Sequence, residues 1–429
     1  MDNFLKRYLK GDYAIWMVYF ALALISIVEM FSASSQFVPK EGIMTKILQH
    51  AIHLGFGFVL LVIVHMVDSK TIKLCGYLGL TLSFCLLIYT SFKGLTADDG
   101  AARWLELGGR QFQPSEIAKL SLIIVVADWI DRAQNPEFQR KYFGWLALAI
   151  CITCGLIMTE NLSTAVILFA VVLLMMFIGS ISIKRIMIFM GIIIGTVILI
   201  FLSVKFVPQE QFAEEYMQQQ SGIYGKYLHT FKRVYVWDKR ISEFAKKSDS
   251  NTQKFIITDD NRQIQHSQIA IAKGGIIGVM PGNSVQRNRL PEASNDFIFA
   301  IIVEELGMIG GIVVIFLYLV LLFRSGKIAY KSDTVYPAIL VTGLSLMIVI
   351  QAFIHIGVAV GLGPVTGQPL PLISRGGTSI LVNSIYFGVI LGISRTQNNQ
   401  QEKLTANQDI SNNEEANNEN SAQQIVEQL

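Results

Sequence analysis

One carboxylate stands at the entrance to an apolar stretch and two more lie about two turns deeper within it, so this stretch is the first place to look for chemistry. Residues 294–296 read Ser-Asn-Asp, and the apolar run that follows carries Glu304 and Glu305. Because Ser, Asn and Asp are preferred N-cap residues, the pattern predicts a helix that starts near Phe297. Ionisable groups at or below a membrane surface cost free energy, so by default they indicate function. Asp296 is therefore the candidate functional acid, and an N-cap aspartate that orders the helix is the alternative.

The two glutamates have a different expected role because of their depth. A helical rise of about 1.5 Å per residue places Glu304 and Glu305 roughly 12 Å below Asp296. We therefore expect them to be structural or coupling residues.

Basic residues in the polar segments could bind an anion or could have a structural function. Arg103 beside Trp104 is typical of an interfacial anchor, and together with Arg110 it could equally bind an anionic headgroup. Glu116 and Lys119 lie three residues apart in a helix that begins at Pro114. They can neutralise each other inside the membrane as an internal salt bridge.

The segment 361–379 contains prolines and repeated glycines and includes Ser374, Arg375, Gly376 and Gly377 at the entrance to another apolar helix. Non-helical backbone at membrane depth is tolerated where it lines a cavity. The free N–H groups of the following helix favour an anion. A ligand-lining role is therefore favoured over a simple turn.

The elements that must position these residues are membrane helices. The chain has 429 residues, of which 52% are hydrophobic and only 16% are charged. Apolar runs predict an all-α polytopic membrane protein with about ten transmembrane helices. We place them near 13–33, 47–67, 73–92, 112–130, a short fifth at 145–159, 161–179, 184–204, 297–323, 335–357 and 378–395.

Lys and Arg in the short loops predict that both termini are cytoplasmic. The chain then divides into a cytoplasmic N-terminus, 1–12, a transmembrane domain, 13–395, and a tail, 396–429, which is rich in Asn, Gln and Glu. We expect the tail to be disordered. The large extracytoplasmic loop is 205–296, and paired basic residues at 232–247 predict an amphipathic helix on the outer leaflet.

Several classes of function are disfavoured by what the sequence contains. The four cysteines all fall inside predicted helices and are interpreted as buried thiols. No nucleotide-binding loop, metal cluster or serine triad is evident, and nothing indicates a nucleic-acid partner. Asp296, the basic residues and the glycine-rich wall on the outer face together suit a lipid-linked phosphate substrate in the outer leaflet.

Three long motifs resemble one protein family. They read ARWLELGGRQFQPSEIAK, GNSVQ followed by LPEASNDFIFAIIVEELG, and GLGPVTGQPLPLISRGGTS. They are similar to the signatures of the SEDS proteins (shape, elongation, division and sporulation), and the similarity extends through the last predicted helix. The GNSVQ and ISRGGTS segments resemble the division member more closely, and the PVTG segment resembles the elongation member.

The resemblance implies a peptidoglycan glycosyltransferase that polymerises lipid II outside the cytoplasmic membrane. In this family the acid at the position of Asp296 is catalytic, and its expected role is general base on the acceptor sugar hydroxyl. Positive groups must then stabilise the leaving pyrophosphate. The candidates for this substrate-binding role are Arg103, Arg110, Lys119, Ser374, Arg375, Gly376 and Gly377. A divalent cation, Mg²⁺ or Mn²⁺, could share the task, although the metal ligands stay unknown.

The resemblance also implies partners, and it leaves two other functions open. A class B penicillin-binding protein, which is a transpeptidase, is the expected partner together with other division proteins and membrane lipids, at the division site of the bacterial cytoplasmic membrane. A lipid II flippase and a non-catalytic division scaffold are the alternatives. The chain has Arg375 where the family commonly has an aromatic residue, Thr366 where many division members have lysine, and Asn295 where threonine is commoner.

Overall fold

The computed structural model confirms a helical, polytopic architecture. It describes residues 10–34, 40–93, 95–96, 102–107, 110–205, 257, 261–290 and 293–427. The helices are α2 (Tyr13–Ser34), α3 (Lys40–Met66), α4 (Ser69–Lys93), α5 (Pro114–Arg132), α6 (Pro136–Glu160), α7 (Leu162–Ile178), α8 (Ile183–Lys205), α11 (Arg262–Gly274), α12 (Ile298–Tyr330), α13 (Val335–Val360) and α14 (Gly377–Glu427). A short 3₁₀ turn, η2, covers Gln286–Asn288.

A helix lies at each of the ten positions expected from the sequence, although α5, α7 and α8 are not among the described helices that meet the length and composition of a membrane span. In the described part of the chain, 7 helices are long and apolar enough to cross a membrane by length and composition. The shorter α7 is also apolar, and α5 is rich in charged residues. The fifth helix is longer than expected: α6 runs for 25 residues, because Asn135 accepts a hydrogen bond from the Glu137 amide and Pro136 occupies the first turn.

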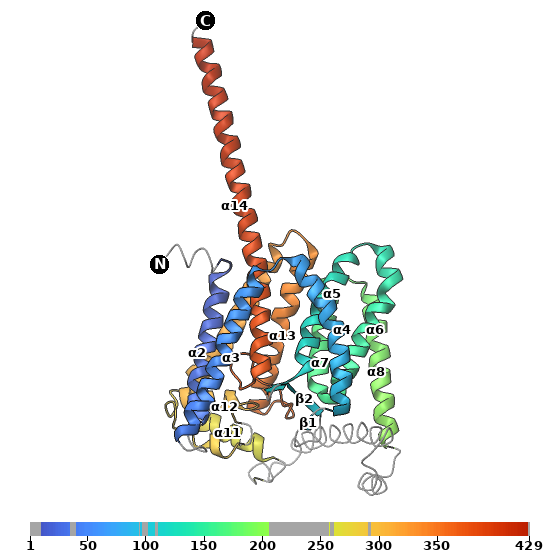
Figure 1. Ribbon diagram of the computed structural model, residues 1–429, viewed down its shortest axis with the longest axis vertical. Helices are drawn as coiled ribbons and strands as arrows, with labels where there is room; N and C mark the ends of the chain where they lie inside the picture. The colour runs from blue at the N-terminus through green and yellow to red at the C-terminus, as the bar shows by residue number, and fades with distance from the viewer. Residues whose placement is uncertain are drawn as a thin grey trace.

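The two ends of the bundle carry different elements (Figure 1). The beginning of α2 and the extension of α14 lie at one end, whereas α11 and the short strands lie at the other. At the first end Asp12 caps α2 by accepting from the Ala14 amide, 2.9 Å away. Its second oxygen accepts from the Arg324 Nε of α12 at 2.9 Å. This is the end that the loop charges predict to be cytoplasmic.

Polar contacts also join the helices on the inner side. Asp128, 1% exposed near the end of α5, binds Lys73 at 2.7 Å and Arg132 at 2.8 Å. Between α3 and α4, the Thr71 hydroxyl donates to Asp68 at 2.6 Å. This hydrogen bond lowers the pKa of the Asp68 carboxyl, because it stabilises the charged form.

The outer segment before α5 is a small sheet, which was not expected from the sequence. Strand β1 covers Leu95–Thr96, β2 covers Ala102–Leu107 and β3 covers Arg110–Phe112, in the antiparallel order β1-β2-β3. Alternating apolar and polar residues on both sides of Gly-Gly are a hairpin signal, which is easily overlooked among long apolar helices. Strand β3 contacts α14, and β2 contacts α4, so the sheet lies beside the start of α14.

Two other regions bear on the expected domain boundaries. Helix α14 continues to Glu427, which differs from the disorder expected for 396–429. The segment is polar but contains neither Pro nor Gly, so a helix started in the membrane can propagate through it at little cost. The basic amphipathic helix expected at 232–247 lies outside the described residues.

Candidate active site at the outer end of α12

Helix α12, which carries the acidic motif, is broken within the membrane at Gly307. Its φ of 71° and ψ of −175° are not helical. The break frees backbone groups, and residues 275–280, which follow α11, satisfy them. Val279 and Met280 donate to the carbonyls of Glu304 and Glu305 at 3.0 and 2.9 Å, and the Met308 amide donates to Gly275 at 2.9 Å. Backbone polar groups in the membrane must find such partners.

Glycine is required at both contacting positions of this break. A Cβ on Gly307 would lie 2.2 Å from the Ile276 carbonyl oxygen, and a Cβ on Gly278 would lie 2.2 Å from the Glu305 carbonyl oxygen. Both residues also have positive φ, at 71° and 87°. The glycines of the LPEASNDFIFAIIVEELG motif and of the segment after α11 therefore permit one backbone to pack against the other.

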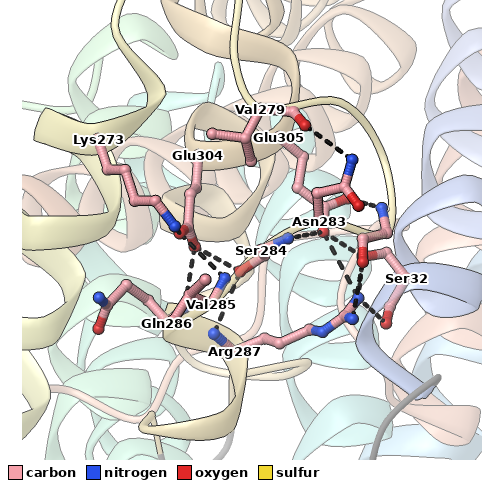
Figure 2. Close-up of polar contacts among 11 residues, drawn as sticks. Ser32, Lys273, Val279, Asn283, Ser284, Val285, Gln286, Arg287, Glu304 and Glu305 are labelled. Atoms are coloured by element: carbon pink, nitrogen blue, oxygen red, sulfur yellow. Dashed lines mark hydrogen bonds and ion pairs between the residues drawn. The ribbon is translucent and has the colours of Figure 1, made fainter.

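The paired glutamates hold the loop that leads toward Asp296 (Figure 2). Glu304 accepts from the amides of Val285 and Gln286 at 3.1 and 3.2 Å and from the Ser284 hydroxyl, and Lys273 lies 3.3 Å away. Both glutamates are 0% exposed. The loop thus wraps a buried carboxylate with backbone N–H groups, which offsets the cost of burying the charge.

Glu305 extends this network to the first membrane helix (Figure 2). Its carboxylate accepts from the amides of Gly282 and Ser284 at 3.1 and 3.2 Å and from the Ser32 hydroxyl of α2. Arg287, 3.7 Å from this carboxylate, donates to the Ser32 carbonyl at 2.6 Å and the Gly282 carbonyl at 2.8 Å. These contacts fit the structural role expected for Glu304 and Glu305.

Asp296 lies in the turn 293–297, one residue before the N-cap position of α12. The N-cap is Phe297, whose side chain cannot accept a hydrogen bond. The side chain of Asp296 is partly exposed. Asp296 therefore lies at the outer end of the helix as a partly exposed residue whose Oδ1 atom is buried, and the N-cap position itself belongs to Phe297.

The segment 361–376 is packed directly against this turn. The Ser374 hydroxyl donates to the Asn295 carbonyl at 2.7 Å and accepts from the Leu370 amide at 2.7 Å. The Arg375 amide donates to the Ser294 carbonyl at 3.0 Å. Ser374, only 3% exposed, therefore holds the Asp296 turn in place, whereas the sequence indicated a substrate contact for this residue.

The ISRGGTS motif also brings one cationic residue, Arg375, onto the segment that packs against the Asp296 turn. The side chain of Arg375 is exposed and has no ion-pair partner among the residues that the structure describes. Helix α14 begins at Gly377, as the sequence predicts, and Gly376 precedes it. A Cβ at Gly377 would lie 2.9 Å from His53 Nε2 of α3, so a glycine is needed for this close approach.

The remaining candidate cations are in a different environment. Lys119 is 2% exposed and donates to Glu116 at 2.7 Å, which is the internal salt bridge expected from their spacing. Arg103 is in β2 and Arg110 is in β3, and their side chains lie outside the described set. The strand β3 contacts α14, which brings the backbone of Arg110 toward the same outer region.

Comparison with known proteins decides the family. The family model described as cell cycle protein, which covers FtsW, RodA and SpoVE, matches residues 12–399. This chain belongs to that SEDS family. It is 29% identical over 402 residues to the probable peptidoglycan glycosyltransferase FtsW of Coxiella burnetii, covering 91% of this chain and 98% of that protein. It is 28% identical to the peptidoglycan glycosyltransferase MrdB of Escherichia coli, with 89% and 93% covered.

Solved structures show the same fold. This protein matches a chain in the solved structure "Structural coordination of polymerization and crosslinking by a peptidoglycan synthase complex". The TM-score is 0.67 and the identity 21%, over 91% of this chain and 99% of that chain. It also matches the Thermus thermophilus rod shape determining protein RodA, with a TM-score of 0.61 and 20% identity, over the same shares. At this level of identity the similarity establishes the architecture.

The structure of this SEDS protein adds residues that were not expected from the sequence. Gln351 and His355 lie one turn apart on α13 and bind the carbonyls of Pro369 and Gln368, at 2.9 and 2.8 Å. In addition, the Tyr318 hydroxyl of α12 donates to the Pro371 carbonyl at 2.6 Å. The signal that could have found the first two was a Gln and a His at spacing i, i+4 in an otherwise apolar helix.

Proposed function

We propose that this SEDS protein polymerises lipid II into β-1,4 glycan strands, as a peptidoglycan glycosyltransferase at the outer face of the membrane. Its family membership and its relatives, which are named peptidoglycan glycosyltransferases, support the enzyme class. The observation that carries the proposal is the position of Asp296. Asp296 is a partly exposed residue at the outer end of α12, with its Oδ1 atom buried, in a turn that is hydrogen-bonded to the segment bearing Arg375.

The reaction requires a base and a stabilised leaving group. In the proposed step, Asp296 accepts the proton of the 4-hydroxyl of the acceptor GlcNAc. The oxygen attacks the anomeric carbon of the donor MurNAc with inversion, the bond to the pyrophosphate breaks, and undecaprenyl pyrophosphate leaves. The proton stays on the Asp296 carboxyl until it is passed to solvent, so that atoms and charge balance.

Positive groups near Asp296 would stabilise the charge that develops on the pyrophosphate. Arg375 is the best placed, because its guanidinium is exposed and has no ion-pair partner within the described part of the chain. The amides of Gly376 and Gly377 at the α14 start add backbone donors. Arg103 and Arg110 are further proposed contacts. Lys119 is also a candidate, although Glu116 already neutralises its charge.

A divalent cation, Mg²⁺ or Mn²⁺, is a separate proposal. Among the described residues, no group of three or more His, Cys, Asp or Glu is arranged to hold a metal ion. The residues described therefore do not form a protein metal site, and the step above is written without one.

The proposal extends to partners and location. The multi-pass membrane architecture supports a location in the bacterial cytoplasmic membrane. A similar fold is known from a peptidoglycan synthase complex that couples polymerisation and crosslinking, which supports a class B penicillin-binding protein as the partner. Relatives named FtsW support a role at the division site with other division proteins.

The test is polymerisation of lipid II in detergent, where the two sides of a membrane do not exist. The full chain is purified with its co-purifying transpeptidase, as wild type, Asp296→Asn and Asp333→Asn. Asp333 is an exposed carboxylate on the inner connection between α12 and α13 and serves as the matched control. We expect Asp296→Asn to lower the rate by on the order of 10²–10⁴, since a general base contributes that much. Asp333→Asn should polymerise at the wild-type rate.

Three outcomes would contradict the proposal. Polymer formed by Asp296→Asn at the wild-type rate would remove the catalytic function of this residue. Movement of lipid II across vesicle membranes by a wild-type protein that makes no polymer would support a flippase. A protein with neither activity, whose Asp296→Ala variant still sustains division, would act as a scaffold.

A further inference from the structure

His355 on α13 lies at the level where α12 begins, and it takes no part in the proposed reaction. Its side chain is 1% exposed. An intramembrane histidine without partners would be costly, yet this one has a partner on each ring nitrogen. Nδ1 lies 2.8 Å from the Gln368 carbonyl oxygen, and Nε2 lies 3.4 Å from the Phe299 amide nitrogen.

The chemistry of the two partners fixes the state of the ring. A carbonyl oxygen can only accept, so Nδ1 carries the proton and donates to Gln368. The Phe299 amide can only donate, so Nε2 must present its lone pair. His355 is therefore a neutral imidazole with the proton on Nδ1, and a protonated ring would place an Nε2 hydrogen against the Phe299 N–H.

This contact supplies the cap that α12 lacks in its own sequence. The first amides of a helix have no partner within the helix. Phe297 at the N-cap cannot accept a hydrogen bond, and Phe299 is in the first turn. The Nε2 lone pair of His355 accepts from that amide across the gap between two helices. The helix start that follows Asp296 is thereby tied to α13.

The other ring nitrogen ties the same point to the segment that bears Arg375. Gln368 also donates through its side chain to the Thr164 hydroxyl of α7, at 2.8 Å. Six residues further on, Ser374 donates to the Asn295 carbonyl, one residue before Asp296. These contacts form a closed ring. The start of α12 is bonded to His355, His355 to Gln368, and the segment 368–374 to the turn that precedes α12.

We propose that His355 is a positioning residue that sets the position of Asp296 relative to the Arg375 segment, by capping α12 with Nε2 while Nδ1 holds Gln368. The expected effect of His355 on catalysis rests on the proposed function. Its expected effect on the structure of the α12 start does not. Loss of the bridge frees the first turn of α12 from α13 and from Gln368, and leaves the Asp296 turn joined to the Arg375 segment through the hydrogen bonds of Ser374 and of the Arg375 amide.

The experiment compares His355→Leu, His355→Gln and Gln351→Leu in the full chain with its co-purifying transpeptidase. Leucine removes both hydrogen bonds, and glutamine retains one donor and one acceptor. Gln351→Leu is the matched control, because it removes a hydrogen bond to the neighbouring carbonyl of Pro369 and leaves the cap of α12 in place. Hydrogen–deuterium exchange of the peptide covering 294–301 and the kcat and KM for lipid II are measured for each variant.

We expect His355→Leu to accelerate amide exchange in 294–301 and to lower kcat on the order of tenfold to a hundredfold, with KM changed less than about twofold, because misplacement of a catalytic group acts on the chemical step. His355→Gln should recover most of kcat and of the slow exchange. Gln351→Leu should retain the slow exchange of 294–301.

Unchanged exchange in 294–301 for His355→Leu would overturn the proposal even if the enzyme were inactive. Equal acceleration in Gln351→Leu and His355→Leu would also overturn it, because the effect would then come from the loop alone. Faster exchange in His355→Leu with wild-type kcat would refute the positioning of Asp296. If instead Asp296→Asn polymerises normally, the catalytic role proposed for Asp296 fails, while the exchange result still decides whether His355 caps α12.

Discussion

At the level of single residues, the buried carboxylates show how a charge is retained inside a membrane protein. Glu305 is 0% exposed, and its two oxygens accept from backbone amides and the Ser32 hydroxyl, with the Arg287 guanidinium nearby. The sequence marks it correctly as a costly residue that must have a function. Its partners are supplied by an outer loop and by α2, which the adjacent sequence does not reveal.

Removing the charge of Glu305 should destabilise the fold. We expect Glu305→Gln to lower the free energy of unfolding by about 3–5 kcal/mol, because the buried Arg287 loses its counter-charge. Replacing Arg287 by Met in the same chain should recover part of this loss, since the two changes are coupled. The measurement is reversible unfolding in mixed detergent micelles.

Glu402→Gln is the matched control for this substitution. Its side chain is 72% exposed on the α14 extension, so the change should be within about 0.5 kcal/mol. Equal stability of Glu305→Gln and the wild-type protein would show that the carboxylate network of Figure 2 does not hold the loop.

At the level of helices and loops, the break in α12 positions the site. The pairing of residues 275–280 with the broken turn anchors the outer loop against α12, and the loop held by the two glutamates follows directly after it. The sequence predicts an apolar helix that starts near Phe297. It does not predict the break, because Gly307 within an apolar run is equally compatible with a continuous helix.

A methyl group at the break should be poorly tolerated. We expect Gly307→Ala to destabilise the protein by about 2–4 kcal/mol, because the residue has positive φ and the methyl group would contact a backbone carbonyl. Gly326→Ala in the same helix is the control, because a Cβ at that position would have no atom within 4 Å. That change should be neutral or should stabilise by up to about 1 kcal/mol.

Both variants are heated in detergent, and the fraction of protein that stays monodisperse is measured as a function of temperature. Equal melting temperatures for Gly307→Ala and Gly326→Ala would mean that α12 can run straight through this point.

Across the whole molecule, the two ends of the bundle carry different elements. The small sheet and α11 lie at one end, and the beginning of α2 and the extension of α14 lie at the other (Figure 1). The candidate site belongs to the first end, and the contacts of Asp12 with Arg324 and of Asp128 with Lys73 belong to the second. This polarity is what a polymerase of lipid-linked sugars in the outer leaflet requires, because substrate and base must be on the same side.

The orientation can be tested with single cysteines in a variant that lacks Cys75, Cys85, Cys151 and Cys154. A cysteine replacing the exposed Arg262 at the start of α11 should react with a membrane-impermeant maleimide in intact spheroplasts. One replacing the exposed Lys184 at the start of α8 should react only after the membrane is opened. Labelling of Lys184→Cys in intact spheroplasts would invert the topology and place Asp296 inside.

Apolar length and helix-start residues are local signals, so the amino-acid sequence was enough to predict the helical membrane architecture and the motifs of the family. The packing of the helices decides which of these residues are in contact with one another. Ser374 binds the carbonyl of Asn295, 79 residues away, and Arg287 binds Ser32 across 255 residues. His355 caps a helix to which it does not belong. The physical reason is that each buried polar group in a membrane must find its partner wherever the fold supplies one, however distant in the chain.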